Sequence, residues 1–281
     1  MRATSSCDKT LIIVISVLYF QKNHATPIVG GRLVTTEGAT NSKYPYVVSL
    51  QDVIVAKNGQ SESYQHFCGG SLISERYILT AAHCVWKKKL QRIVAFIGYE
   101  NMQNVDYLER YGVDKAEYIY FQPSNYRNDI ALLHLKRDYQ SQISRHLQFA
   151  QLPPPGIRPH GNESCRIIGY GATRHAGPSQ KQLYEADVRV IGNQQCRDII
   201  GHIWAPKNGE NTVCALGNNQ DSCQGDSGGP LICRYGSEGR EYIYGLVSHG
   251  LTCGLKGMPS IYTVTRAYDD WVQLFVPRLT V

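Results

Sequence analysis

The sequence is poor in the features that mark membrane-spanning, zinc-binding and nucleic-acid-binding proteins. Its longest apolar run, residues 11–20, is too short to cross a bilayer, which needs about 20 residues. No two cysteines form a CxxC pair, so a zinc site is not expected. The formal net charge is only +6, and the one dense basic run, Lys87–Lys89, is typical of a solvated loop rather than a polyanion site. We therefore expect neither a membrane nor a nucleic acid as a partner.

Methionine and phenylalanine are also scarce, at 3 and 6 residues, whereas the chain has 19 Tyr and 26 Gly. Tyrosine favours strands, and glycine favours tight turns. Short runs rich in Val, Ile, Leu and Tyr recur between turn residues, which favours an all-β barrel or sandwich over alternating strands and helices. Residues 52–65 begin apolar and end polar, and we interpret them as a long exposed hairpin loop. The expected strands are 46–51, 71–74, 93–98, 130–135, 166–169, 231–234, 243–248 and 261–264.

Two segments divide or end this series of strands. Three consecutive prolines, Pro153–Pro155, predict a linker between two halves of similar length, because proline cannot lie in a central strand. Residues 267–276 predict an amphipathic C-terminal helix, with Trp271, Leu274 and Phe275 on one face.

The first residues have the pattern of a secretion signal. Arg2 and Lys9 precede the apolar run, and Ala25 is a small residue suited to signal peptidase. We interpret residues 1–25 as a signal peptide and the protein as secreted; the alternative is a short buried strand or helix. Of the 9 cysteines, Cys7 lies in this leader, and the even set that remains fits disulfides in an oxidising compartment. Eight cysteines allow 105 pairings, so spacing alone does not choose among them.

Three short motifs, far apart in the chain, contribute three different reactive groups. Residues 80–84 (TAAHC) contain His83, residues 128–133 (NDIALL) contain Asp129, and residues 225–230 (GDSGGP) contain Ser227. Acyl transfer by serine needs a hydroxyl nucleophile, an imidazole that takes its proton and a carboxylate that orients the imidazole. A lone His beside a Cys, or a lone Asp before a strand, has an ordinary structural explanation. The three together, with the specific GDSGGP string, predict a catalytic triad.

With these motifs the chain resembles the chymotrypsin-type serine proteases over residues 28–276. The resemblance implies an all-β fold of two six-stranded antiparallel β-barrels and a short C-terminal α-helix, with the active site between the barrels. It also implies an oxyanion hole made by the N–H groups of Gly225 and Ser227. The implied disulfides are Cys68–Cys84, Cys165–Cys233, Cys196–Cys214 and Cys223–Cys253. The implied segments are a short propeptide at 26–27 and a peptidase domain at 28–281, with a first barrel at about 28–145, a linker at about 146–160, a second barrel at about 161–265 and a helix at about 266–276.

The same resemblance gives a primary specificity pocket. Asp221 stands where trypsin-like members have the acid that binds a substrate Lys or Arg. Two positions depart from the family pattern: His249 replaces a Trp, and Ser260 replaces a Gly that leaves room in the pocket. We expect cleavage after Lys or Arg; the alternatives are an elastase-like or narrowed specificity and a non-catalytic binding homologue. The full set of expected pocket residues is Asp221, Ser222, Gln224, Ser248, His249, Gly250 and Ser260.

The expected mature N-terminus is Ile28, whose freed ammonium would pair with Asp226 as in the family. Most relatives have Lys or Arg before this bond, but this chain has Pro27. We therefore expect signal peptidase to cut after Ala25 and a proline-specific dipeptidyl aminopeptidase to remove Thr26 and Pro27. The alternatives are direct cleavage by signal peptidase before Ile28 and a chain that is never activated.

The remaining expectations concern metals, modification and partners. Tyr99 stands where calcium-binding members have a Glu, and the spacing of Glu100 and Glu109 is a weak signal, so we expect no metal and no cofactor. Asn162 is the acceptor of the only N-glycosylation sequon. We expect a monomer that acts on protein or peptide substrates and meets macromolecular protease inhibitors.

Overall fold

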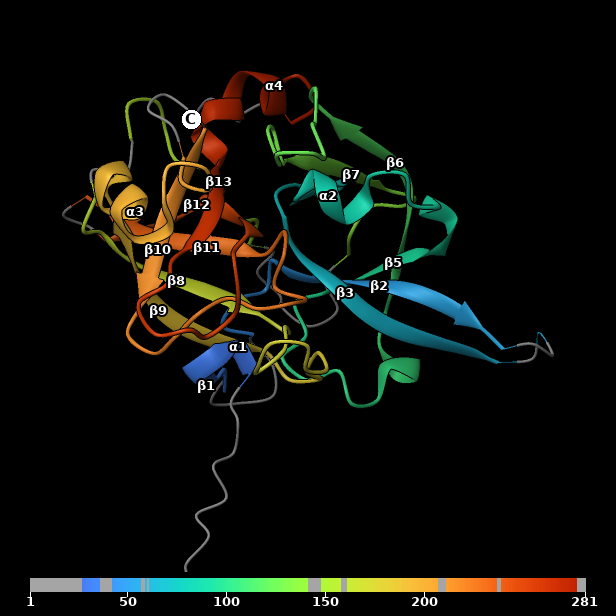
Figure 1. Ribbon diagram of the computed structural model, residues 1–281. Helices are drawn as coiled ribbons and strands as arrows, with labels where there is room; N and C mark the ends of the chain where they lie inside the picture. Colours follow the sequence, from blue (N-terminus) through green and yellow to red (C-terminus); the bar gives the residue numbers. More distant parts are fainter. Residues whose placement is uncertain are drawn as a thin grey trace, which may run out of the picture.

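The computed structural model describes residues 27–35, 42–56, 59, 61–140, 148–157, 161–206, 211–236 and 239–276. The predicted signal peptide and Thr26 lie outside the described residues, as do parts of the predicted linker. The described elements form two barrels side by side, with few and short helices (Figure 1).

The first barrel closes in the strand order β2-β3-β4-β7-β6-β5, and all of its pairings are antiparallel. Its interior is apolar because the inward side chains are mostly Val, Ile, Leu and Ala at positions that are almost fully buried. Its strands are β2 (Val47–Val55), β3 (Glu62–Leu72), β4 (Tyr77–Thr80), β5 (Ile93–Ile97), β6 (Tyr111–Tyr118) and β7 (Ala131–Leu135).

The second barrel follows the order β9-β10-β13-β12-β11-β8 and is closed by pairing of β8 with β9. The fold expected from the resemblance, two six-stranded antiparallel barrels, is therefore confirmed. A short strand β1 (Arg32–Leu33) adds to the outside of β9, so the N-terminal segment belongs to the second barrel and not to the first as expected. The strands of the second barrel are β8 (Ser164–Gly169), β9 (Tyr184–Ile191), β10 (Thr212–Gly217), β11 (Pro230–Tyr235), β12 (Arg240–His249) and β13 (Ser260–Val264).

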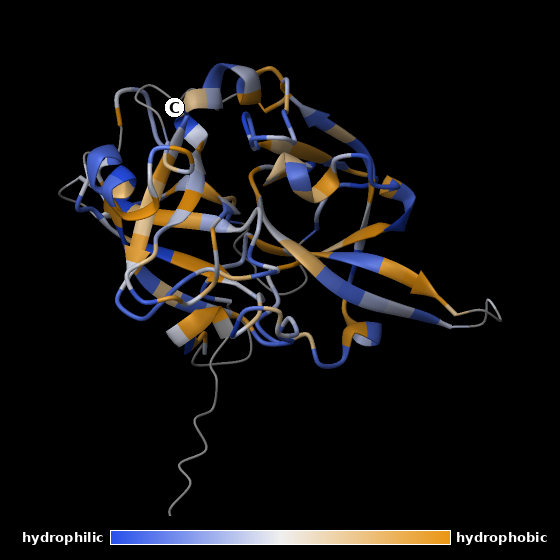
Figure 2. Ribbon diagram, viewed as in Figure 1, coloured by the Kyte–Doolittle hydropathy of each residue, from blue (hydrophilic) through white to orange (hydrophobic). Residues whose placement is uncertain are grey.

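The segment expected to be a long hairpin loop is mostly strand. The β2–β3 ladder runs out to the pair Val55↔Glu62, so the two strands extend well beyond the barrel (Figure 1). The apolar end of β2 is seen in Figure 2, and it includes Ile54 and Val55. The ladder satisfies the backbone groups that face the partner strand, and an antiparallel ribbon of this kind can expose a face to water.

A buried carboxylate attaches the N-terminal segment to the second barrel. Glu185 on β9 is 3% exposed and accepts hydrogen bonds from Tyr44 and Lys43, which precede β2, and from Arg32 on β1. Burial alone would raise the pKa of Glu185, but these donors and the nearby Arg166 lower it. The charge of Glu185 is thus compensated inside the protein. Its hydrogen bonds attach the segment that follows Ile28 to β9.

The helices differ from the prediction at the C-terminus. A 3₁₀ turn, η3 (Thr265–Tyr268), precedes α4 (Asp269–Gln273), so the α-helix is shorter than the expected 267–276. Of the predicted inward face, Leu274 is 77% exposed, whereas Trp271 and Phe275 pack against the apolar cluster that includes Tyr268 and Val272. Those side chains contact apolar residues of both barrels, so α4 packs over their junction.

The remaining helices are short. They are α1 (Pro27–Gly30), whose backbone is not helical at Ile28 and Val29, α2 (Ala82–Val85), α3 (Asn193–Ile200), and the 3₁₀ turns η1 (Leu90–Arg92) and η2 (Val105–Tyr107). No helix among the described residues has the length and apolarity needed to cross a membrane.

The described cysteines form four disulfides, and their pairs are those that the resemblance implies. They are Cys68–Cys84, Cys165–Cys233, Cys196–Cys214 and Cys223–Cys253. The first connects β3 with α2, and the second connects the paired strands β8 and β11.

Candidate active site

His83 and Asp129 come together because the strands beside them pair. His83 lies on α2, which follows β4, and Asp129 precedes β7; β4 and β7 are neighbours with Thr80 opposite Ala131. The carboxylate of Asp129 receives both the backbone N–H of His83, at 2.8 Å from Oδ1, and the ring Nδ1, at 2.7 Å from Oδ2. The pairing of two strands thus produces the His–Asp pair predicted from motifs 46 residues apart.

Asp129 is fully buried, and a third donor reaches it from the other barrel. The hydroxyl of Ser248 on β12 donates to Oδ2 at 2.5 Å. An ionised carboxylate only accepts hydrogen bonds, so Nδ1 of His83 must have the proton that points at Asp129. Nε2 of the neutral ring then keeps its lone pair, which is the state that a general base needs.

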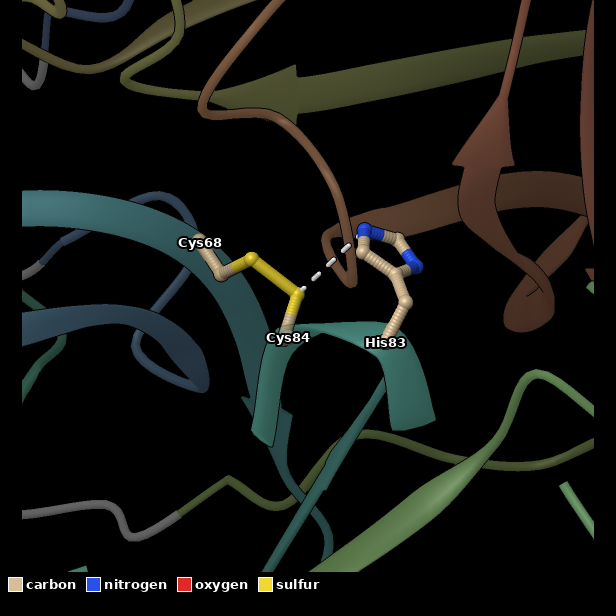
Figure 3. Close-up of side chains that lie close together, drawn as sticks. All are labelled: Cys68, His83 and Cys84. Atoms are coloured by element: carbon tan, nitrogen blue, oxygen red, sulfur yellow. Dashed lines mark hydrogen bonds between the residues drawn. A yellow bond between two sulfur atoms is a disulfide. The ribbon is translucent and has the colours of Figure 1, made fainter. Parts of the chain in front are cut away.

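Ser227 lies next to His83 across a disulfide sulfur. Its backbone oxygen is 3.6 Å from Cys84 Sγ, and His83 Nε2 is 3.8 Å from the same sulfur (Figure 3). No hydrogen bond joins the Ser227 hydroxyl to His83 in the described structure; such bonds are often long in unliganded enzymes and tighten with substrate. The group formed by Cys68, His83 and Cys84 has the ligand types of a metal site, but its two sulfurs are bonded to each other and cannot act as thiolates.

Two backbone N–H groups beside Ser227 have no acceptor within the described part of the chain. They belong to Gly225 and Ser227, the predicted oxyanion hole. The carbonyl of Gln224 accepts from the N–H of Ala172 at 2.7 Å, and a trans peptide directs the following N–H, that of Gly225, to the opposite side. Gly225 has a φ of 98°, a conformation that disfavours any side chain.

A half-buried histidine binds the carbonyl of the next peptide. The ring Nε2 of His66 is 2.8 Å from the carbonyl oxygen of Gly225, and its Nδ1 is 2.7 Å from the hydroxyl of Ser49. Burial lowers the pKa of His66 to about 4, so the ring is neutral. Because a carbonyl only accepts, Nε2–H donates to Gly225 and Nδ1 accepts from Ser49. The hydrogen bond from His66 thereby fixes the carbonyl of Gly225. The N–H groups of Gly225 and Ser227 point away from that side of the loop.

The predicted specificity acid is buried and has only neutral partners. Asp221 is 5% exposed and accepts from the hydroxyl of Ser260 at 2.7 Å and from the N–H of Gly254 at 2.9 Å. Burial raises its pKa to about 6, although both donors oppose this shift. Ser260 also narrows the space around the acid, since a Cβ on Gly250 would lie 3.1 Å from its Oγ.

The other predicted pocket residues lie on the two segments that border Asp221. Ser222 and Ser248 are buried, whereas Gln224 is exposed. The amide of Gln224 donates to His175 Nδ1 at 3.0 Å, so it is held by the loop after β8. His249 is half-buried and lines a cavity of about 560 Å³ beside the site.

Ile28 is already buried in the described chain, in which it still follows Pro27. Its side chain is 0% exposed in the core of the second barrel. Asp226 is 1% exposed and accepts from the N–H groups of Gly171 and Cys223, both at 2.8 Å. Burial raises the pKa of Asp226 to about 7. No cation reaches Asp226 among the described residues, so the carboxyl lacks the partner that a freed N-terminus would supply.

The two acids considered for calcium have other partners. Glu100 accepts from the backbone N–H of Lys43 at 2.9 Å, and Glu109 pairs with Arg137 at 2.7 Å. Asn162 is exposed just before β8, as an acceptor for a glycan would need to be.

A family comparison agrees with this geometry. The model of the trypsin family matches residues 33–272. The chain belongs to the trypsin family. Similar curated proteins include tissue-type plasminogen activator of Rattus norvegicus, 35% identical over 241 residues, and of Homo sapiens, 34% identical over 242 residues. In both comparisons the match covers 79% of this chain but 42% of the relative, so this trypsin-family chain matches about two fifths of their length.

Sequence reasoning missed several residues of this trypsin-family site. Ser49 and His66 support the Gly225 carbonyl, and Tyr126 contacts the ring of His83 edge-on at 5.5 Å. His66 lies two residues before Cys68, and of the two only the cysteine was interpreted from the sequence. Tyr126 lies three residues before Asp129, but no spacing rule distinguishes it from the other tyrosines.

The raised pKa of Asp221 predicts that cation binding weakens in mild acid. Above its pKa of about 6 the carboxyl is ionised, and only that form attracts a cation. Calorimetry with benzamidine should give an affinity that falls about tenfold per pH unit below this pKa. Asp221→Asn is the control and should bind weakly, with a flat pH dependence. An affinity in the wild type that stays constant from about pH 7 to pH 5 would contradict the assignment.

Proposed function

We propose that this trypsin-family serine protease is a secreted endopeptidase that cleaves protein substrates after Lys or Arg. The observation that supports this most strongly is Asp221, a buried carboxyl with neutral donors and no cation in the described structure. Burying an unpaired carboxylate is costly, and a substrate ammonium or guanidinium provides the missing partner.

In the proposed reaction, His83 Nε2 takes the proton of the Ser227 hydroxyl while Oγ attacks the carbonyl carbon of the substrate. The carbonyl oxygen becomes an oxyanion that the N–H groups of Gly225 and Ser227 bind. Asp129 stabilises the imidazolium through the Nδ1 hydrogen bond of 2.7 Å. The imidazolium then gives its proton to the leaving amine, which leaves an acyl-enzyme on Ser227. Water, activated by the same ring, hydrolyses the ester and restores the hydroxyl.

Ser260 motivates a second candidate specificity. Its hydroxymethyl group lies between Asp221 and Gly250, which favours a short side chain in the pocket and an elastase-like preference. The charge argument for Lys or Arg is stronger, because a short apolar side chain would leave Asp221 without a cation. A non-catalytic binding homologue is the remaining alternative, and labelling of Ser227 by a serine-directed phosphonate separates it from an enzyme.

The disulfides support the proposed compartment, and the similar proteins support the proposed partners. Four disulfides fit an oxidising, extracellular environment. The similar proteins are named as activators of plasminogen, which gives those relatives a protein substrate. We propose protein substrates and macromolecular inhibitors for this chain, and a monomeric enzyme.

For activation we propose that the chain becomes active when the bond before Ile28 is cut. Asp226 then gains the α-ammonium of Ile28, and the buried side chain of Ile28 supports this position. Pro27 excludes self-activation after Lys or Arg, so removal of Thr26 and Pro27 by a proline-specific dipeptidyl aminopeptidase is the proposed route. Signal peptidase cleavage directly before Ile28 is the competing route.

Replacement of the nucleophile tests the reaction. Ser227→Ala should lower peptide hydrolysis by several orders of magnitude, since the oxyanion hole and substrate binding alone give about 10³–10⁴ over water. Steady-state kinetics on the purified variant measure this, with benzamidine binding and thermal unfolding as checks that the protein is folded. Turnover near that of the wild type would refute the mechanism.

Two pocket variants test the specificity. Ser260→Gly should raise kcat/KM for at least one Lys or Arg substrate, because it removes atoms between Asp221 and Gly250. Asp221→Ser should abolish the preference for basic residues. Cleavage profiling on a peptide library measures both effects. A wild type that prefers Phe or Val would overturn the charge argument, and an unchanged Ser260→Gly would overturn the steric one.

A defined N-terminus tests activation. Protein that starts at Ile28 should be at least about 10²-fold more active than protein that starts at Thr26, because only the former supplies a cation to Asp226. Its activity should fall at high pH as the ammonium loses its proton, from a pKa that Asp226 raises above the reference of about 8. Asp226→Asn in the Ile28 form is the control and should lose the advantage. Equal activity of the two forms would show that the ion pair is not needed.

The route itself is tested separately. N-terminal sequencing of the secreted protein should give a Thr26 start when proline-specific dipeptidyl peptidase activity is inhibited. An Ile28 start under that inhibition would favour direct cleavage by signal peptidase.

A further inference from the structure

A second histidine is connected to the His–Asp pair through one hydroxyl. Ser248 Oγ lies 2.5 Å from Asp129 Oδ2 and 3.0 Å from Nδ1 of His249. His83 is bonded to the same Asp129 oxygen, at 2.7 Å. The four side chains therefore form one hydrogen-bonded series from His83 through Asp129 and Ser248 to His249.

The direction of each hydrogen bond in this series follows from chemistry. The Asp129 carboxylate only accepts, so the single hydroxyl proton of Ser248 points at Asp129. The contact between Ser248 Oγ and His249 then requires Nδ1 of His249 to be the donor. Burial lowers the pKa of His249, so the ring is the neutral Nδ1–H tautomer near pH 7. A ring protonated only on Nε2 would compete with Asp129 for the proton of Ser248.

The face of the same ring packs against the loop that leads to Asp129. Tyr126 stacks on His249 with ring centroids 4.6 Å apart and an interplanar angle of 23°. Tyr126 also meets the ring of His83 edge-on, with centroids 5.5 Å apart and an interplanar angle of 73°. Tyr126 has a φ of 56°, a conformation that costs energy for a residue with a bulky side chain. The stack on His249 is a contact that holds it there.

An irregularity in β12 explains how adjacent residues act on one site. Val247 lies opposite Tyr262 and His249 lies opposite Ile261, so Ser248 is an extra residue in the ladder. In a regular strand, neighbouring side chains point to opposite faces. A bulge re-aims them, and here it brings the side chains of Ser248 and His249 within 3.0 Å of each other.

We propose that His249 is a positioning residue for the catalytic pair, acting through its edge on Ser248 and through its face on Tyr126. The edge keeps the Ser248 proton on Asp129, so that the buried carboxylate retains its full set of donors. The face keeps Tyr126 against His83 and forms part of the cavity of about 560 Å³ beside the site. This inference rests on the proposed protease function and adds a role for a position where the family has a Trp.

Two substitutions separate the edge from the face. His249→Phe keeps a ring for Tyr126 but loses the donor, and it should lower kcat about tenfold with KM changed less than about twofold, as expected for loss of one hydrogen bond to the catalytic network. His249→Asn has an amide N–H near the position of Nδ1 but no ring. It should keep kcat within about threefold of the wild type and raise KM, because the wall formed with Tyr126 is lost.

A double-mutant cycle tests whether the edge acts through Ser248. In a Ser248→Ala background, His249→Phe should have no further effect on kcat. The Nδ1–H of His249 then has no Ser248 hydroxyl to which it can donate. Thermal unfolding of each variant checks that the protein is folded, and all rates are divided by the active fraction found by titration with a serine-directed phosphonate.

The outcomes distinguish this inference from the proposed function. A wild type that does not react with the phosphonate would refute the protease function itself. A reactive wild type with unchanged kcat in His249→Phe would overturn only the role of His249. Full additivity with Ser248→Ala, or a kcat for His249→Asn as low as that for His249→Phe, would also overturn it.

Discussion

The arrangement of the active site depends on the burial of one carboxylate, that of Asp129. A charge with no exposed surface is stable only if hydrogen bonds replace the water it has lost. Two of its donors come from His83, beside the first barrel, and the third comes from Ser248, in the second. The carboxylate therefore sets the orientation of the imidazole and also joins the two barrels at the bottom of the site.

The loop of Ser227 is held in the same way, by contacts that converge on its backbone. Ala172 binds the carbonyl of Gln224, and His66 binds that of Gly225. A Cβ on Gly171 would lie 2.3 Å from a carboxylate oxygen of Asp226, so glycine is required at this close approach. These partners come from strands and strand ends of both barrels. The N–H groups of the proposed oxyanion hole are thus oriented through neighbouring carbonyl groups of the same loop.

The contact between His83 and Asp129 could be expected from sequence because the motifs around them are short and specific, whereas much of the surrounding structure could not. The ladder of β9 was missed because Glu185, Asp187 and Arg189 give it a polar appearance, although Glu185 is buried among cations that are distant in sequence. β6 was missed for a similar reason, since its exposed face is charged. The role of His249 depends on the bulge at Ser248, and strand periodicity alone does not predict an extra residue.

The hydroxyl of Ser260 reduces the free-energy difference between the pocket without a cation and the pocket with one. Because this hydroxyl already donates a hydrogen bond to Asp221, the carboxylate is less destabilised when no cation is bound. If the pocket binds Lys or Arg as proposed, that side chain gains less free energy on entering than it would from an acid without a donor. Under the proposed specificity, the same hydroxyl therefore weakens the binding of the substrate and that of a product that keeps the basic side chain.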